Sequence, residues 1–258
     1  MKIQFTKYQG TGNDFIMIDD RSKQLNLNIA QITKICDRKM GIGADGLILI
    51  REHSNSDFEM VYYNSDGSQS LCGNGSRCAV NFALSLGIVN EKAEFMTIDG
   101  VYSATIEQDI VHLNMKDISG ITFKDPDYYI HNGSPHHIIF QTNVQSTDVK
   151  SEGRAVRNSA PYKAEGTNVN FVQVVNENEI FVRTYERGVE DETLSCGTGV
   201  TAASLASIRQ GVSSPVKVKT LGGYLSVSYK QTEKDTFSEI VLSGPAVKVF
   251  EGKYELPD

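Results

Sequence analysis

One sequence pattern occurs twice in the chain, and this internal duplication constrains the fold more than any other feature. Cys72 and Cys196 each stand directly before Gly-x-Gly, in CGNG and CGTG, and a run of apolar and small residues follows each. Each run closes at a glycine 15 residues past its cysteine, at Gly87 and at Gly211. Glycine there is typical of a helix C-terminus. We therefore predict two buried helices, each beginning at a cysteine.

The segments around these helices also echo one another. Three further pairs of segments match: 58–67 with 180–188, 97–106 with 220–229, and 10–19 with 166–175. The period is far too long for a solenoid, so a whole domain is duplicated. The pattern predicts an α+β fold with two pseudo-symmetric halves. Each half is expected to be a curled, mostly antiparallel β-sheet around a central buried helix, with the active site in the cleft between the halves.

Strand patterns near MKDISGITFKDP place the boundary between the halves at about residue 119. We expect residues 1–118 to form the N-terminal half, which carries Cys72. Residues 119–248 should form the C-terminal half, which carries Cys196, and a last strand at 249–258 can return to the first half.

Charge and cysteine usage exclude several classes of function. The 258 residues carry a net charge of −7, which repels nucleic-acid phosphates, so no nucleic-acid partner is expected. The N-terminus lacks a signal-peptide apolar region, and no apolar run approaches the ~20 residues that span a membrane. We expect a cytoplasmic protein whose four cysteines stay reduced. No spacing suits a zinc site, so no metal is predicted.

The segment GIGADG (41–46) matches the letters of a dinucleotide-binding loop. It follows a helix-like segment and precedes a strand, which reverses the order that the motif requires. Nicotinamide binding is therefore not expected.

The two cysteines suit one kind of chemistry. The first turn of a helix presents unpaired backbone N–H groups and a partial positive charge, which favour a thiolate and can hold a carboxylate. Two such thiols, one ionised and one neutral, can remove a proton from a substrate α-carbon on one face and deliver one on the other. Cys78 has no counterpart in the second half, and Cys36 lies on the apolar face of a predicted helix, so both are expected in the core.

Seven blocks occur in order between residue 6 and about residue 205: GTGNDFIMID, GIGADGLI, NSDGS…CGNGSRC, SPHH, GTNVNFV, YERG and CGTGVTAA. Together they resemble diaminopimelate epimerase. The resemblance implies an epimerase without a cofactor that interconverts LL- and meso-diaminopimelate, an amino acid on the route to lysine and peptidoglycan. It is also compatible with a homodimer.

The resemblance also implies roles for particular residues. Cys72 and Cys196 would be the acid/base pair, and His136 and Glu186 would tune the thiols. The residues implied in binding substrate are Asn13, Asn64, Gly73, Asn74, Asn168, Glu186, Arg187, Gly197 and Thr198. Such a set provides acceptors for ammonium groups and donors for carboxylates. Asn64 also lies in N-S-D-G, where turn formation is an alternative role.

Some departures and alternatives stay open. Ser134 stands where the family often has asparagine, the loop ERGVEDET is longer than in many members, and a substrate contact by Ser134 or Gly46 is undecided. The alternative functions are another amino-acid racemase or epimerase, a thiol redox protein, and an amino-acid-binding protein that needs neither cysteine. Asn74 argues against the proline racemases, which typically have histidine there.

Overall fold

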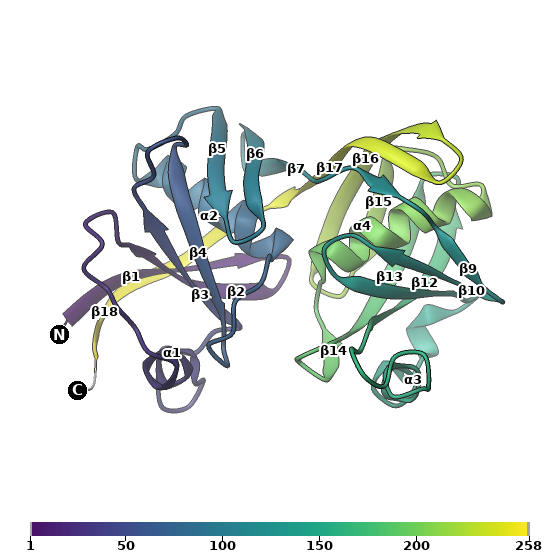
Figure 1. Ribbon diagram of the computed structural model, residues 1–258, viewed down its shortest axis with the longest axis horizontal. Helices are drawn as coiled ribbons and strands as arrows, with labels where there is room; N and C mark the ends of the chain where they lie inside the picture. Colours follow the sequence, from purple (N-terminus) through teal and green to yellow (C-terminus); the bar gives the residue numbers. More distant parts are fainter. Residues whose placement is uncertain (1, 257–258) are drawn as a thin grey trace. The chain divides into compact units, whose positions relative to one another are not determined.

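The chain folds as two units, and each unit gathers its strands around one central helix (Figure 1). The computed structural model describes residues 2–256. The first unit comprises Met1–Leu113 together with Gly244–Asp258, and the second comprises Asn114–Ser243. None of the helices in the described residues has both the length and the apolar character needed to cross a bilayer.

The first unit surrounds helix α2 with strands. Its elements are β1 (Lys2–Gly10), β2 (Asn13–Asp19), α1 (Ile29–Cys36), β3 (Gly46–Arg51), β4 (Phe58–Asn64), α2 (Gly73–Ser85), β5 (Lys92–Thr97), β6 (Gly100–Glu107), β7 (Ile110–Asn114) and β18 (Val247–Glu255). Neighbouring strands are antiparallel except β2 with β3 and β4 with β5, which are parallel. The C-terminal strand β18 pairs with β1. Helix α2 packs against the N-terminal strands β1 and β2 and also against the C-terminal strand β18.

The second unit repeats this plan around helix α4. Its elements are β8 (Ile118–Ser119), β9 (Thr122–Lys124), β10 (Asp127–His131), β11 (Pro135–Phe140), a 3-10 turn (Val144–Ser146), α3 (Val149–Arg157), β12 (Asn168–Asn176), β13 (Glu179–Glu186), β14 (Asp191–Thr193), α4 (Gly197–Ala206), a second 3-10 turn (Ser207–Gln210), β15 (Val216–Thr220), β16 (Gly223–Glu233) and β17 (Thr236–Pro245). The parallel pairs are β11 with β12 and β13 with β15, which match those of the first unit.

This repeated topology confirms the expected fold class of two sheet-dominated, pseudo-symmetric halves. The predicted hairpins join β5 to β6 and β15 to β16. Both are closed in the same way: Thr97 Oγ1 donates to the Gly100 carbonyl at 2.8 Å, and Thr220 Oγ1 donates to the Gly223 carbonyl at 2.9 Å.

One predicted correspondence is wrong. Segments 10–19 and 166–175 contain β2 and most of β12, which do not occupy equivalent places. Strand β2 lies between β1 and β3, whereas β12 is parallel to β11 and antiparallel to β13, as β3 is to its own neighbours. A glycine turn followed by a largely buried strand is a local pattern, and its recurrence does not fix topology.

The central helices are buried because small and apolar residues cover every side of them. All ten residues of α4 are buried, as are the first eight of α2. Gly87 and Gly211 follow with φ of +70° and +80°, the left-handed conformation that ends a helix without a Cβ penalty. Cys78 is fully buried, and burial raises the pKa of its thiol to about 12.

Helix α1 begins with a capping box and covers the apolar face of β3. The Asn28 side chain accepts from the Gln31 backbone N–H, and the Gln31 side chain accepts from the Asn28 backbone N–H. Cys36 ends α1 inside the apolar cluster formed with β1, β2 and β3. Burial raises the pKa of its thiol to about 12, which confirms Cys36 as a core residue.

Candidate active site

Both cysteines are the N-cap residues of the central helices. Cys72 has φ −130° and ψ 112° before α2, and Cys196 has φ −120° and ψ 111° before α4. The Cys72 sulfur accepts a hydrogen bond from the Gly75 backbone N–H at 3.3 Å, in the way that serine caps a helix. The Cys196 sulfur lies 3.6 Å from Thr198 Oγ1. Each thiol therefore stands at the positive end of its helix, as the sequence predicts.

In the first unit, the side chain of Asn13 joins Cys72 to Asn74. The Cys72 thiol donates to Asn13 Oδ1 at 3.6 Å, and Asn74 Nδ2 donates to the same oxygen at 3.3 Å. Asn74 and Gly73 are buried in the first turn of α2. Three of the predicted substrate-binding residues therefore lie together with the first thiol.

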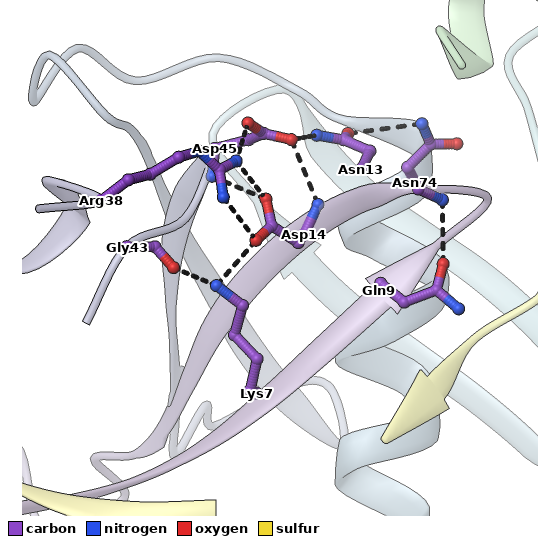
Figure 2. Close-up of polar contacts among 9 residues, drawn as sticks. Lys7, Gln9, Asn13, Asp14, Arg38, Gly43, Asp45 and Asn74 are labelled. Carbon is purple, nitrogen blue, oxygen red and sulfur yellow. Dashed lines mark hydrogen bonds and ion pairs between the residues drawn. The ribbon is translucent and has the colours of Figure 1, made fainter. Parts of the chain in front are cut away.

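A charged network lies behind Asn13, and the sequence reading did not anticipate it (Figure 2). Asp45 Oδ2 accepts from Asn13 Nδ2 at 2.7 Å, and Asp45 Oδ1 accepts from Arg38 at 2.6 Å. Arg38 also binds both oxygens of Asp14, and Lys7 reaches Asp14 at 2.7 Å and the Gly43 carbonyl.

Asp14 stays ionised in this network. Burial raises its pKa, but hydrogen bonds from Arg38 and Lys7 and their positive charges outweigh burial and lower the pKa to about 2. Lys7 is buried and paired, since an unpaired ammonium there would be costly. The network is thus a fixed array of full charges beside the first thiol helix.

Asn64 ends β4 and holds the turn that follows it. Its Nδ2 faces the Ser68 carbonyl, Ser68 Oγ and Ser70 Oγ at 3.0–3.2 Å, and its Oδ1 accepts from Tyr62 at 2.8 Å. The alternative role in turn formation is therefore present in the structure.

In the second unit, Asn168 fixes the position of Arg187. Asn168 Oδ1 accepts from the Arg187 backbone N–H at 2.9 Å, and Asn168 Nδ2 donates to the Pro135 carbonyl at 3.1 Å. The Arg187 guanidinium donates to the Glu165 carbonyl at 3.0 Å. Asn168 thus helps to position Arg187, and its role in binding substrate stays a prediction.

Glu186 and Thr198 are each held by a neighbouring side chain. Glu186 Oε2 accepts from Thr193 Oγ1 at 2.9 Å, between the paired strands β13 and β14. The Thr198 carbonyl, next to Gly197 in the first turn of α4, accepts from Asn132 Nδ2 at 2.8 Å. Ser134 is half-buried, and its carbonyl accepts from the Asn132 backbone N–H at 3.2 Å.

His136 is fully buried on β11, and its Nδ1 lies 3.2 Å from Asn170 Nδ2. Burial lowers its pKa to about 3, helped by the positive charges of His131 and Arg187, so the imidazole is neutral at pH 7. Among the described residues, His136 Nε2 has no hydrogen-bond partner. Asn170 also donates to the His137 carbonyl and accepts from Thr184 Oγ1 at 3.0 Å.

Asn170 was missed in the sequence, although a signal for it exists. Residues two apart on a strand face the same side, so Asn168 implies that Asn170 faces the same way. Asp45 was missed because GIGADG matched a nucleotide motif that the element order excludes. Its partner Asn13 is 32 residues away along the chain, a distance that no local pattern bridges.

Comparison with known proteins decides the family. The diaminopimelate epimerase family profile matches residues 5–118 and 128–249. The chain belongs to the diaminopimelate epimerase family. The diaminopimelate epimerase of Flavobacterium psychrophilum is 50% identical over 250 residues, covering 95% of this chain and 97% of that protein. That of Aquifex aeolicus is 39% identical and covers 97% of each chain.

Solved structures of other proteins share the fold of this diaminopimelate epimerase family member. A PhzF-family phenazine biosynthesis protein from Bacillus anthracis superposes with a TM-score of 0.74 at 14% identity, covering 99% of both chains. A hydroxyproline epimerase from Agrobacterium vitis superposes with a TM-score of 0.73 at 12% identity, covering 100% of this chain and 93% of that one. At such identities, the likeness concerns the fold.

Proposed function

We propose that this chain is an isomerase that converts LL-diaminopimelate to meso-diaminopimelate, in precursor synthesis for lysine and peptidoglycan. The observation that carries the proposal is the membership of the diaminopimelate epimerase family across nearly the whole chain, with both Cys-Gly-x-Gly helix starts intact. The expected reaction uses no cofactor, because two thiols suffice for the proton transfers.

The proposed chemistry inverts one α-carbon. A thiolate removes the α-proton from one face, and the thiol of the other cysteine delivers a proton to the opposite face. Cys72 and Cys196 are the proposed pair, with each sulfur about 3–3.5 Å from the reacting carbon at the moment of transfer. The reverse reaction exchanges the two roles. One thiol must be ionised and the other neutral, so the pair titrates as a coupled system.

The helix starts supply the electrostatic part of the proposal. Loss of the α-proton spreads negative charge into the substrate carboxylate, and the backbone N–H groups of the two helix starts, at Gly73-Asn74 and Gly197-Thr198, are suited to hold it. Of the substrate's ammonium and carboxylate groups, Glu186 suits the former and Arg187 the latter, while Asn13 and Asn64 provide amides. The hydrogen bond from the Arg187 backbone N–H to Asn168 Oδ1 supports a role for Asn168 beside Arg187, and His136 and Glu186 are the proposed thiol-tuning groups.

The test follows isotope and stereochemistry together. The protein is incubated with LL-diaminopimelate in D₂O under reducing conditions, and α-deuteration and the LL-to-meso ratio are measured. We expect exchange with inversion, and its loss in both Cys72→Ala and Cys196→Ala. Cys36→Ala is the matched control, since it removes a buried thiol from α1, and it should keep the activity. Inversion that survives in both single variants would exclude the two-thiol mechanism.

The same assay separates the alternative functions. Inversion of proline or hydroxyproline but not of diaminopimelate would indicate another racemase. Activity that appears only after oxidation would indicate a thiol redox protein, whereas an oxidised thiol pair should inactivate the epimerase. A homodimer and a cytoplasmic location are part of the proposal, and sedimentation of the purified protein tests the first.

A further inference from the structure

The loop GIGADG (41–46) has no role in the proposed chemistry so far, yet its side chains and carbonyls reach the first thiol site. Asp45 bonds to Asn13, Gly43 accepts from Lys7, and Gly46 begins β3. We infer that Asp45 is a positioning residue: its carboxylate holds the Asn13 amide so that the carbonyl oxygen faces Cys72 and the N–H groups face away. The inference builds on the proposed function, in which Cys72 is one of the two acid/bases.

The amide orientation follows from the chemistry of its partners. A carboxylate is an acceptor only, so the atom of Asn13 that lies 2.7 Å from Asp45 Oδ2 must be the nitrogen. The reversed amide would set two oxygens against each other at that distance. The carbonyl oxygen of Asn13 is thereby turned towards Asn74 Nδ2, as Figure 2 shows, and towards the Cys72 sulfur.

Asp45 itself is held on three sides. Its Oδ2 also accepts from the Asp14 backbone N–H at 3.2 Å, its Oδ1 accepts from Arg38 at 2.6 Å, and its own backbone N–H donates to Asp14 Oδ1 at 3.1 Å. Arg38 and Lys7 balance the two carboxylates. Rotation of Asp45 away from Asn13 would break charge-assisted hydrogen bonds, so these bonds favour the observed amide orientation.

The consequence falls on the protonation of Cys72. Its sulfur accepts from Gly75 N–H and donates to Asn13 Oδ1, a pattern that only the neutral thiol can complete. A reversed amide would donate to the sulfur and favour the thiolate instead. Arg77 and Cys78, on the same helix, also interact electrostatically with Cys72, and neither is changed by the substitution below. Asp45 thus favours the neutral thiol of Cys72, which is the form that donates a proton to the substrate.

The same loop also supports Asn64. A Cβ on Gly46 would lie 2.4 Å from the Tyr62 ring and 2.6 Å from the Tyr63 carbonyl, so only glycine lets Tyr62 take its place there. The Tyr62 hydroxyl donates to Asn64 Oδ1 at 2.8 Å. One six-residue segment therefore orients Asn13 and Asn64, two of the three amide side chains in the first half that the resemblance assigns to substrate.

The test compares Asp45→Ala with Asp19→Ala. Asp19 also binds an arginine, Arg21, but at the other end of β2. In folded Asp45→Ala we expect alkylation of Cys72 by iodoacetamide to rise about tenfold relative to that of Cys196, because the released Asn13 amide can donate a hydrogen bond to the sulfur and favour the thiolate. Both alkylation rates are measured at one pH by peptide mass spectrometry. The kcat for diaminopimelate should fall about tenfold while KM changes less than about threefold. Asp19→Ala should match the unaltered protein in all three.

For Asp45→Asn, we expect a kcat and a Cys72-to-Cys196 alkylation ratio between those of Asp45→Ala and Asp19→Ala. An amide has one oxygen for the donors of Asn13, Asp14 and Arg38, so one of them must face an N–H group. A folded Asp45→Ala protein whose kcat, KM and Cys72-to-Cys196 alkylation ratio all match those of Asp19→Ala would overturn the inference.

A measurement on the unaltered protein decides the matter if the variants do not fold. The side-chain amide protons of Asn13, assigned by their loss in Asn13→Ala, should exchange with solvent at least about tenfold more slowly than those of the exposed Asn55. Equal exchange rates would refute the held amide. The alkylation ratio and the exchange rate need no substrate, so they test Asp45 even if diaminopimelate is not turned over, an outcome that would count against the proposed function alone.

Discussion

Replacing Gly199 by alanine is expected to destabilise the second unit, although the same change usually favours a helix. Gly199 lies in the first turn of α4, three residues after Cys196. A Cβ there would lie 2.4 Å from Asn170 Oδ1 and 3.3 Å from the Cys196 sulfur. The Asn170 side chain cannot simply rotate away, because it is fully buried and hydrogen-bonded to His136, His137 and Thr184.

The magnitude follows from what the methyl group displaces. Moving Asn170 Oδ1 breaks the bond from Thr184 and leaves buried polar atoms unsatisfied, at a cost of about 1–3 kcal/mol. Overpacking the closed site costs about 1–3 kcal/mol more. Alanine returns about 1 kcal/mol of helix propensity. The net loss in the free energy of unfolding should therefore be about 3 kcal/mol, or a fall of roughly 6–12 °C in Tm for a chain of this size.

The first half supplies the matched control. Gly75 is the equivalent residue, three positions after Cys72, and a Cβ there would lie 3.1 Å from Ile48 Cδ1 and 3.4 Å from Phe15. The end of an isoleucine side chain can shift by a few tenths of an ångström, so Gly75→Ala should change the unfolding free energy by less than about 1 kcal/mol. Thermal unfolding followed by circular dichroism compares the two. Equal Tm values for Gly199→Ala and Gly75→Ala would refute the reasoning.

Three further outcomes follow from buried groups. The pKa of His136 is lowered to about 3 in the folded protein by burial, so the unfolded state takes up an extra proton as the pH falls below about 6.5. The unaltered protein should therefore lose up to about 1.4 kcal/mol per pH unit more than His136→Gln in urea unfolding between about pH 6 and 4, and parallel curves would contradict this. Among the described residues, Nε and Nη2 of the fully buried Arg77 have no hydrogen-bond partner. Arg77→Met should therefore raise the free energy of unfolding by about 1–3 kcal/mol, while lowering kcat. A lower free energy of unfolding in a chemical-denaturation series would count against this expectation. Cys36→Ala should cost about 1–2 kcal/mol in the same series and leave kcat unchanged, and a loss of activity without loss of stability would show that this thiol is not merely core.

Much of the fold could be predicted because its signals are local and occur twice. A cysteine before Gly-x-Gly, a run of small residues and a closing glycine define both central helices, and the turn residues define both hairpins. Each signal rests on conformational limits that a short segment carries by itself. The same locality explains the failure at 10–19 and 166–175, where similar letters form strands with different neighbours.

The surroundings of the thiols were less predictable, since they depend on contacts between distant segments. Asp45 and Arg38 contact Asp14 because β2 and β3 are parallel neighbours, and no local sequence pattern predicts this pairing. Thr184 meets Asn170 across the β12–β13 pair in the same way. Residue types indicated which side chains suit the substrate, whereas strand pairing decided which groups contact Asn13 and Asn170.

The pairing of β18 with β1 has a consequence for the order in which the protein is made. The second unit is continuous in sequence, so all of its strands are synthesised before β18. The first unit closes its sheet only when residues 247–255 have been synthesised and reach β1. Domains generally fold as units during synthesis. The first unit is therefore completed after the second, and the edge of β1 stays without its β18 partner while the whole second unit is synthesised.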